Sequence, residues 1–311
     1  MTPPPDGVAV RVDSPTEARN PRTQDIDRLS TLDVLRLINA EDHLVPPAVA
    51  AVLPELARAA DLAVGALRGG GRVHYVGAGT SGRLATLDAA ELVPTFNAPP
   101  DWFVAHHAGG RDALVNAVED VEDQGSDGAA EIRKHAAAGD LVVGVTASGR
   151  TPFVMAALEE ARTLGAHTVL VSNNPTAPAP VDVDVLIAVD TGPEAIAGST
   201  RMKAGTSQKL VLTSFSTAVM VRLGRTYSNL MVSMRATNAK LRGRTVRILR
   251  EATGLGEQEC TTALADSGGD LKVALVHLLS GAPAALAAEA LERTQGHVRM
   301  ALSQLAPGAT G

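Results

Sequence analysis

The middle of the chain alternates between short apolar runs and longer stretches in which apolar residues recur at helical spacing. Five of the apolar runs are typical of buried strands, at residues 72–79, 101–109, 140–149, 167–174 and 183–192. The intervening stretches with the clearest helical spacing are residues 81–93, 112–123 and 152–165. Strands that alternate with helices predict an α/β fold with a doubly wound five-stranded parallel sheet.

Helical patterns flank this region on both sides. Two helices are predicted before the first strand, at 30–42 and 46–67. After the last strand, a long helical stretch is predicted over 202–250, with a break near Gly224. Short amphipathic segments complete the chain.

These patterns divide the 311 residues into three parts. Residues 1–14 are polar and proline-rich, and we expect them to form a disordered tail. Residues 15–252 are expected to form the α/β domain, which begins with an N-terminal helical arm. Residues 253–311 are expected to form a small helical C-terminal domain.

The composition narrows the classes of protein that fit. Aromatic residues make up 2% of the chain, so the core must be aliphatic and base-stacking platforms are not expected. The net charge is −6 without any lysine- or arginine-rich block, which argues against a nucleic-acid partner. The single cysteine, Cys260, excludes an intramolecular disulfide and a cysteine-cluster metal site. Because neither a signal-peptide pattern nor an apolar run of roughly 18 residues occurs, we expect a cytoplasmic protein with no membrane partner.

Two of the predicted strands end in loops rich in glycine and hydroxyl residues. The first loop is Gly77–Arg83 and the second is Thr146–Pro152. Ligands of open α/β sheets bind at the carboxyl ends of strands, where glycine lets the backbone come close and the next helix points N–H groups at an anion. Such hydroxyls can also serve only as helix caps. Because two such loops occur, we favour a phosphate or sugar site, and its candidate residues are Gly79, Thr80, Ser81, Ser148, Gly149, Arg150 and Thr151.

A third loop, Gly192–Lys209, follows the last predicted strand and carries cations as it enters a helix. Its candidate substrate-binding residues are Glu194, Ser199 and Lys203. Lys203 lies between apolar residues and is the best candidate among the cations, while the others fit a solvated face equally well. In the first two loops, Arg83 and Arg150 could each pair with an anion or lie outside the pocket.

Neither a nucleotide nor a metal ion is expected. The first loop matches the dinucleotide-binding pattern G-x-G-x-x-G, but the second predicted strand ends in Ala105-His106-His107 and lacks the acid that this pattern requires. The lysine of a P-loop is also missing from the sequence of this loop. His106 and His107 are adjacent on a strand and point to opposite faces, so they cannot easily share an ion. We therefore predict a site without cofactor or metal.

Glutamates are the candidates for proton transfer. Glu91 stands in the apolar string LDAAELVP, where partial burial would suit it to donate a proton, although it fits a solvent-reaching helix end equally well. Glu119 and Glu122 would share one face of the predicted helix, which also fits an acidic solvated face. Ser81 and Glu91 are ten residues apart, roughly 15 Å on a straight helix. One small ligand can touch both only if the helix bends or ends early, or if a second subunit supplies one of them.

Together these residues resemble the N-acetylmuramic acid 6-phosphate etherases, a family built on the sugar isomerase (SIS) domain. The resemblance covers nearly the whole chain and is carried by the segments RNPRTQDIDRLSTLDVLRLINAED, VGAGTSGRLATLDAAE, AGGRDALVNAVEDVED, VVGVTASGRTPFV, GPEAIAGSTRMKAGTSQKLVL and SNLMVSMRATNAKL. The GPE…GSTRMKAGT pattern is highly specific, whereas GTSGR with ASGRTP indicates only a sugar-phosphate domain. The helical C-terminal appendage is also typical of this family.

The resemblance implies a lyase that cleaves the D-lactyl ether of N-acetylmuramic acid 6-phosphate to N-acetylglucosamine 6-phosphate and D-lactate, in peptidoglycan recycling. In the family, the ring-opened sugar loses the proton at C2, lactate leaves C3, and water adds to the resulting enal. Glu91 matches the family's proton donor and Glu122 its second catalytic acid. The residues that match hydroxyls of its sugar-phosphate site are Thr80, Ser81, Ser148 and Thr151. These sites are usually built across a homodimer, which would ease the distance between Ser81 and Glu91.

The sequence departs from the family pattern at two places. Leu92-Val93-Pro94 follows the catalytic acid where Cys-Pro-Pro is common, and Ser233 replaces the usual aspartate; both bear on substrate preference and neither removes a catalytic carboxylate. Two other functions fit a SIS domain. One is a non-catalytic regulator that senses a sugar phosphate, but such proteins usually carry a helix-turn-helix or a second SIS unit. The other is an aldose–ketose isomerase, which moves protons between C1 and C2 without losing lactate.

Overall fold

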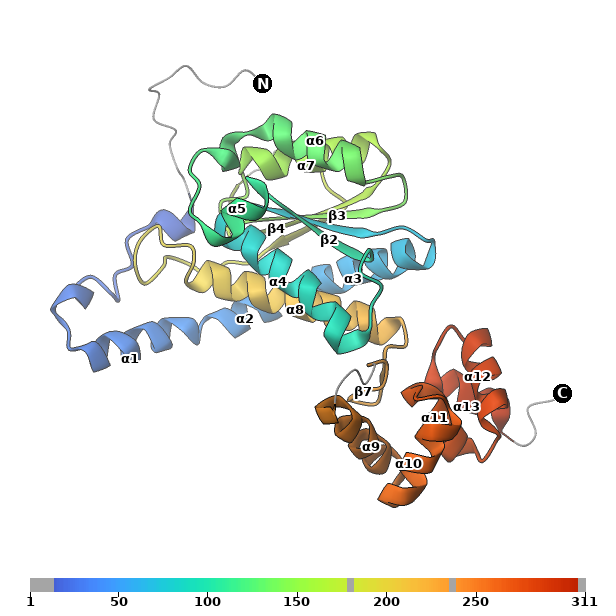
Figure 1. Ribbon diagram of the computed structural model, residues 1–311. Helices are drawn as coiled ribbons and strands as arrows, with labels where there is room; N and C mark the ends of the chain where they lie inside the picture. Colours follow the sequence, from blue (N-terminus) through green and yellow to red (C-terminus); the bar gives the residue numbers. More distant parts are fainter. Residues whose placement is uncertain (1–13, 178–181, 235–238, 307–311) are drawn as a thin grey trace. The chain divides into compact units, whose positions relative to one another are not determined.

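The computed structural model describes residues 14–177, 182–234 and 239–306 (Figure 1). The expected disordered tail, residues 1–14, lies outside the described residues except for Ser14. The chain divides into two compact units, which we call unit 1 (Met1–Leu87 and Phe103–Thr213) and unit 2 (Asp88–Trp102 and Ser214–Gly311). Two helices contribute residues to both units, α4 (Gly79–Phe96) and α8 (Lys203–Arg222).

Unit 1 contains the predicted sheet. Its strands are β1 (Val73–Gly77), β2 (Phe103–His107), β3 (Leu141–Thr146), β4 (His167–Ser172) and β5 (Val185–Ala188). They pair in parallel in the order β2-β1-β3-β4-β5, which confirms the doubly wound five-stranded α/β fold. Each strand is shorter than the apolar run that predicted it, because the glycine and polar residues at the ends of these runs lie in loops.

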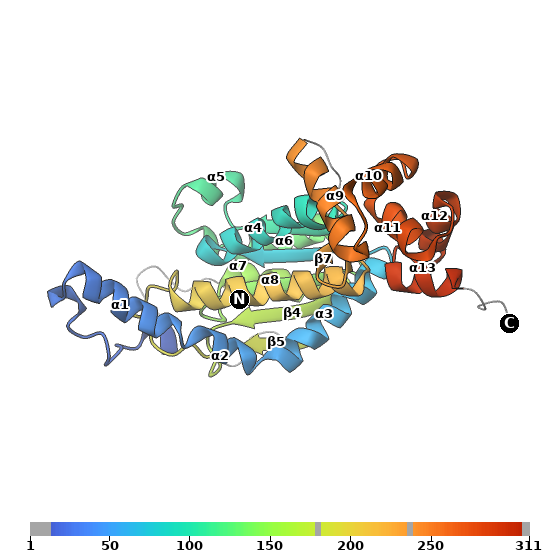
Figure 2. The same ribbon diagram turned by 90° about the horizontal axis from the view of Figure 1, so that it is seen from below.

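Helices cover both faces of this sheet (Figures 1 and 2). α3 (Leu53–Arg68) packs on one face against β1, β3 and β5. α6 (Gly125–His135) and α7 (Pro152–Thr163) lie together on the other face, where α7 contacts β1, β3 and β4. The core on that face is almost entirely aliphatic, as the low aromatic content predicts, and includes Val76, Ile132, Val142, Phe153, Val154, Leu158 and Leu170. Full burial of each such large side chain contributes about 1.5–3 kcal/mol.

The helix predicted over 112–123 is much shorter in the structure. α5 covers Gly110–Val115, irregular chain follows, and a 3₁₀ turn, η3, covers Val121–Asp123. α5 ends where the backbone of Asn116 becomes extended, and Asp120 with φ +65° prevents a helix from continuing into η3. The expectation that Glu119 and Glu122 share a helical face is therefore wrong.

Two further helices differ from the prediction. The single helix predicted over 46–67 is divided into α2 (Val45–Ala50) and α3, because Pro54 in the first turn of α3 lacks an N–H and starts a new helix. The sequence pattern did not predict α6, since Gly125 and Gly128 have low helix propensity. Gly128 is needed there, because an added Cβ would lie 2.0 Å from the carbonyl oxygen of Phe153 on α7.

The N-terminal arm of unit 1 consists of short turns and one longer helix. Its elements are η1 (Pro15–Glu17), η2 (Ile26–Arg28) and α1 (Thr31–Asp42). Ser30 caps α1, since its hydroxyl accepts a hydrogen bond from the backbone N–H of Asp33 (3.3 Å) and donates to the Asp33 carboxylate (2.6 Å).

Unit 2 is mainly helical. α8 ends at the break expected near Gly224 in the helical stretch 202–250, and the small antiparallel hairpin of β6 (Thr226–Tyr227) and β7 (Leu230–Met231) follows it. The remaining helices are α9 (Ala239–Thr253), α10 (Glu257–Asp266), α11 (Leu271–Ser280), α12 (Ala284–Arg293) and α13 (Val298–Leu305). Their shared core contains Ile248, Leu249, Cys260, Leu271, Leu275 and Leu291, so the lone cysteine is a core residue. No single helix in the described ranges is long and apolar enough to cross a membrane, although the bent α11–α12 pair passes on length and composition alone.

A chain of polar side chains links β1, β2 and α6; His74, His106 and Asp140 are buried, whereas Glu131 and His135 are partly exposed. His74 Nδ1 lies 3.0 Å from His106 Nε2, and His74 Nε2 lies 3.1 Å from an oxygen of Asp140. His106 Nδ1 lies 3.3 Å from Glu131, which also faces His135 at 3.6 Å. The pKa of His106 is lowered to about 4, mainly by burial and also by the neighbouring His74, while Glu131 opposes the change. Burial likewise lowers the pKa of His74, against the effect of Asp140.

We expect this chain of histidines to make the fold less stable in acid. Because the folded-state pKa of His106 lies below its usual 6.5, its contribution to stability is complete above pH 6.5 and is lost as the pH falls toward 4. Urea unfolding at pH 6.5 and at pH 4 measures how much the free energy of unfolding falls between them. In His106→Leu this fall should be smaller by up to about 3 kcal/mol. An unchanged pH dependence in that variant would show that His106 is not the titrating group.

Candidate functional site

The strand order reverses between β1 and β3, which are neighbours in the sheet although β2 comes between them in the chain. Gly77 at the end of β1 pairs with Val145 near the end of β3. The two loops predicted from the sequence, Gly77–Arg83 and Thr146–Pro152, therefore leave adjacent strand ends. A reversal of this kind is where open α/β sheets bind their ligands.

The first loop turns from β1 directly into α4. Gly77 and Gly82 of this loop pack backbone to backbone, because an added Cβ on Gly82 would lie 2.6 Å from the carbonyl oxygen of Gly77 and 2.5 Å from the ring of His107. This close packing places Thr80 and Ser81 in the first turn of α4, with Ser81 only 8% exposed and Thr80 half-buried. Within the described part of the chain neither hydroxyl has a hydrogen-bond partner of its own, so both are available to a ligand oxygen.

The second loop gathers three hydroxyls. Thr146 Oγ1 lies 2.7 Å from Thr151 Oγ1 and 3.3 Å from Ser148 Oγ. Thr151 occupies the N-cap position of α7 but makes no side-chain capping bond, so capping alone does not account for its hydroxyl. Gly149 has φ +70°, and Asn174 donates to the carbonyl of Ser148 at 3.2 Å. The loop therefore presents a cluster of three hydroxyls, and the hydrogen bond from Asn174 holds its backbone in place.

The third loop is anchored by a buried glutamate. Glu194 is fully buried, and its two oxygens accept hydrogen bonds from the backbone N–H groups of Lys203 (2.8 Å) and Ala204 (2.9 Å) at the start of α8. Burial raises the pKa of Glu194, while these two N–H groups oppose the change. Ser199 lies half-buried in the same loop. The carboxylate of Glu194 thus caps α8 and fixes the loop between them.

The start of α8 lies beside the first loop. An added Cβ on Gly205 would lie 3.4 Å from Thr80 Cγ2 and 4.0 Å from Leu84 Cδ1. These are ordinary van der Waals distances, so the starts of the two helices lie within packing range of each other. The segments around Thr80, Thr146 and Gly205 therefore converge on one end of the sheet.

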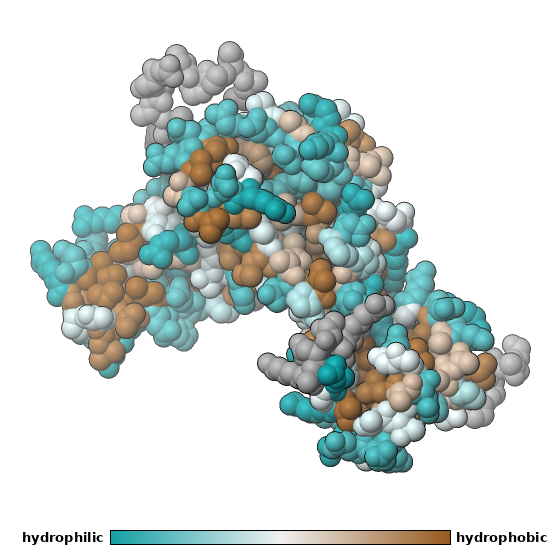
Figure 3. All heavy atoms as spheres, viewed as in Figure 1, coloured by the Kyte–Doolittle hydropathy of each residue, from teal (hydrophilic) through white to brown (hydrophobic). Residues whose placement is uncertain are grey.

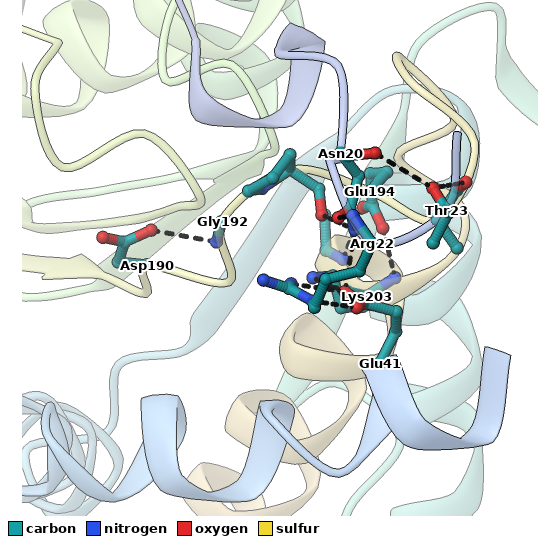
Figure 4. A network of polar contacts seen from close by, with 11 residues as sticks. Asn20, Arg22, Thr23, Glu41, Asp190, Gly192, Glu194 and Lys203 are labelled. Carbon is teal, nitrogen blue, oxygen red and sulfur yellow. Dashed lines mark hydrogen bonds and ion pairs between the residues drawn. The ribbon is translucent and has the colours of Figure 1, made fainter. Parts of the chain in front are cut away.

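Lys203, the best candidate among the cations of the third loop, is fully buried in a network shown in Figure 4. Its Nζ donates to Glu41 of α1 at 2.8 Å, and Asn20 donates to the same oxygen at 2.9 Å. Arg22 binds Glu41 with both Nε and Nη2. The hydrogen bond from Arg22 lowers the pKa of Glu41 to about 2, against the effect of burial and with help from Lys203 and Asn20. Lys203 is therefore half of a buried ion pair.

The same arm also binds the backbone of the third loop. Asn20 donates to the carbonyl of Pro193 at 3.2 Å, and Thr23 donates to the carbonyl of Ala195 at 2.8 Å. Neither the ion pair of Glu41 nor the place of Thr146 in the hydroxyl cluster could be predicted from the sequence, because an acid or a threonine in an ordinary helix or strand pattern carries no local sign of a distant partner. The burial of a cation such as Lys203 requires such a partner.

The two candidate catalytic glutamates are exposed in the single chain. Glu91 lies on the last turns of α4, in unit 2, and the adjacent Leu92 is buried. Of the two positions that the sequence allows for Glu91, partial burial or a helix end that reaches solvent, the single chain shows the second. Glu122 lies in η3, in unit 1. Arg150 is also exposed, next to the hydroxyl cluster of the second loop.

Two cavities of the structure lie away from the predicted site residues. In the described ranges, no group of three or more histidine, cysteine, aspartate or glutamate side chains is arranged to hold a metal ion. Two cavities, of about 860 and 670 Å³, lie within unit 2 among residues of the hairpin and the C-terminal helices. None of the residues predicted for the site lines either cavity.

The fold is shared with known sugar-phosphate proteins. Residues 118–218 match the SIS domain family, and residues 55–162 match the family described as the glucokinase regulatory protein N-terminal SIS domain. A phosphoheptose isomerase from Francisella tularensis superimposes with a TM-score of 0.51 at 20% identity, covering 62% of this chain and 100% of the isomerase. At that identity the likeness supports the fold alone, and it agrees with the SIS architecture.

Curated relatives match over almost their whole length. An N-acetylmuramic acid 6-phosphate etherase from Thermobifida fusca is 64% identical over 269 residues, covering 86% of this chain and 88% of the relative. Another from Serratia proteamaculans is 47% identical over 290 residues, covering 93% and 98%. The loops described above, which carried the resemblance in the sequence, lie within the structured part of the chain that these matches span. This chain therefore belongs to the family of the N-acetylmuramic acid 6-phosphate etherases.

Proposed function

We propose that this protein cleaves the D-lactyl ether of N-acetylmuramic acid 6-phosphate and releases N-acetylglucosamine 6-phosphate and D-lactate in peptidoglycan recycling. The observation that carries the proposal is the convergence of three glycine- and hydroxyl-rich loops where the strand order reverses. Backbone N–H groups at the starts of α4 and α7 suit a phosphate, and the hydroxyls suit its oxygens or those of a sugar. The names of the relatives supply the substrate.

The reaction needs a series of proton transfers and no electron transfer. Opening of the sugar ring places an aldehyde at C1, which makes the proton at C2 acidic. One carboxylate takes this proton as the C3–O bond breaks and a C2=C3 double bond forms, and an acid protonates the departing lactate oxygen. Water then adds its oxygen at C3, and a proton returns to C2. We assign Glu91 as the proton donor and Glu122 as the second catalytic group.

The remaining predicted residues divide into two groups. The residues proposed to touch the substrate are Gly79, Thr80, Ser81, Ser148, Gly149, Arg150, Thr151 and Ser199. Glu194 and Lys203 are proposed to act as positioning residues, because their side chains already bind the protein and hold the third loop in place. Neither a metal nor a nucleotide enters this chemistry.

The release of lactate tests this function. Purified protein incubated with N-acetylmuramic acid 6-phosphate should release D-lactate and N-acetylglucosamine 6-phosphate in equal amounts, without nucleotide and in the presence of EDTA. A coupled D-lactate assay with mass spectrometry of the sugar measures both products. Tight binding of hexose phosphates without any lactate would instead support a sensor.

We further propose that the protein works as a cytoplasmic homodimer without nucleic-acid or membrane partners. The supporting feature is a hydrophobic patch over the N-terminal arm, visible in Figure 3. Its exposed residues include Leu29, Leu32, Leu35 and Leu44. A stripe of large apolar residues on a projecting helix is typical of a surface that another chain covers.

Replacing two of these leucines should separate the subunits. The double variant Leu32→Glu/Leu35→Glu places charge in the patch, so we expect a monomer where the wild-type protein is a dimer at micromolar concentration. Multi-angle light scattering after size-exclusion chromatography measures both masses, with the exposed change Glu159→Gln on α7 as a control. A wild-type monomer, or a dimer that survives both glutamates, would contradict the assignment of this surface.

A further inference from the structure

Arg83 of the first loop binds the protein backbone. Its Nε donates to the carbonyl of Leu114 at 2.9 Å, and its Nη2 donates to the carbonyls of Ala113 (2.8 Å) and Asn116 (3.0 Å). These carbonyls lie at the C-terminal end of α5, which is Gly110–Val115. The last carbonyls of a helix lack partners within it, and a cation there also meets the negative end of the helix dipole. Arg83 therefore caps α5 from a different helix.

α5 leads directly to a candidate catalytic glutamate. Glu122 follows Asn116 by six positions, and the chain between them has no regular structure before η3. The far side of this segment is fixed at Gly109, which has φ +77°. An added Cβ there would lie 2.9 Å from Ala113 Cβ and 3.3 Å from Val121 Cγ1. The two ends of the segment 109–122 therefore pack against each other, and Arg83 on α4 binds the carbonyls between them.

We propose that Arg83 is a positioning residue that couples the substrate-binding first loop to Glu122. This inference rests on the proposed function. The first turn of α4 offers Thr80 and Ser81 to the substrate, and two residues later the same helix holds the segment that presents Glu122. All of these residues belong to unit 1. A shift of about 1 Å in a catalytic group can cost about 100-fold in rate, so a clamp of this kind matters for turnover.

The geometry explains why arginine is needed. Three N–H groups of one planar guanidinium meet three different carbonyls, whereas lysine offers a single ammonium on a flexible stem. Lysine at this position keeps the charge but cannot reproduce the fork. A direct phosphate ligand would respond differently, because its loss weakens binding of the sugar phosphate.

Arg83→Lys and Arg83→Gln separate these two roles. For both variants we expect kcat for lactate release to fall about 10- to 100-fold, while the Kd for N-acetylglucosamine 6-phosphate, measured by calorimetry, stays within about threefold. Hydrogen–deuterium exchange should increase in peptides that cover 110–124 and remain unchanged over β3 and β4. Arg111→Gln, an exposed change on α5 itself, should leave all three readouts as in the wild-type protein.

Two results would overturn this role. A Kd that rises about tenfold or more with kcat unchanged would make Arg83 a phosphate ligand. Unchanged exchange over 110–124 would show that Arg83 does not hold this segment. If the wild-type protein releases no lactate, the proposed function fails, but the exchange measurement still decides whether Arg83 holds the segment.

Discussion

Replacing Glu91 with glutamine should reduce lactate release by about 100- to 10,000-fold, the range that general acid–base catalysis typically contributes. Glutamine has nearly the shape of glutamate but cannot supply a proton to the departing ether oxygen. Its effect should therefore fall on kcat. Binding of N-acetylglucosamine 6-phosphate should stay within about threefold, because the phosphate is proposed to be held by other loops.

The control for this variant is Glu159→Gln, which makes the same chemical change at an exposed helical position on α7. It should have wild-type kcat and Kd. Glu122→Gln should lower kcat as well, since the elimination needs both carboxylates. Turnover by Glu91→Gln within about tenfold of wild type would mean that Glu91 is not the proton donor.

The second large effect is expected on stability. Glu41→Gln removes the counter-charge of Lys203, which is fully buried, and leaves its ammonium without an anionic partner. Loss of one partner of a buried ion pair typically costs about 3–5 kcal/mol. We expect a decrease of that size in the free energy of unfolding, measured by urea titration with circular dichroism.

A double variant distinguishes a lost charge pair from a general packing defect. Glu41→Gln/Lys203→Met removes both charges, so it should be more stable than Glu41→Gln alone. The pH dependence provides a further check. Because the folded-state pKa of Glu41 lies well below its usual 4.5, its contribution is complete above that pH and is lost as the pH falls toward 2. A single variant that loses less than about 1 kcal/mol would contradict the importance of the pair.

This buried pair links stability to the site. Glu41 belongs to α1 of the N-terminal arm, whereas Lys203 begins α8 and follows the third loop. Asn20 and Thr23 bind the backbone of the same loop. The arm therefore serves as an internal support for residues that converge with Thr80, and its polar residues are used inside the protein.

The sheet could be predicted because its signal is local. Strands buried on both faces leave continuous apolar runs, and glycine and hydroxyl residues mark the loops at their ends. The loops around Ser81 and Ser148 were predicted for the same reason, and the parallel pairing of β1 with β3 places them at adjacent strand ends. The sequence pattern itself indicates the chemistry of such loops.

The remaining features depend on contacts between distant segments. The pattern of 112–123 is helical, but the chain leaves the helix at Asn116 and Asp120 has a positive φ, so the surroundings of Glu122 could not be predicted. Arg83 and Lys203 look like possible ligands of an anion in the sequence. In the structure Arg83 binds α5 and Lys203 binds Glu41, because a buried or half-buried cation takes the strongest acceptors within reach.

The most direct test is a crystal structure of the protein with N-acetylglucosamine 6-phosphate bound. We expect phosphate oxygens within about 2.6–3.2 Å of hydroxyls or backbone N–H groups of the first two loops. We also expect carboxylates of Glu91 and Glu122, from the same or a second subunit, to reach the atoms at C2 and C3 directly or through one water. A sugar bound away from these loops, or one with neither glutamate near C2 or C3, would contradict the proposed site.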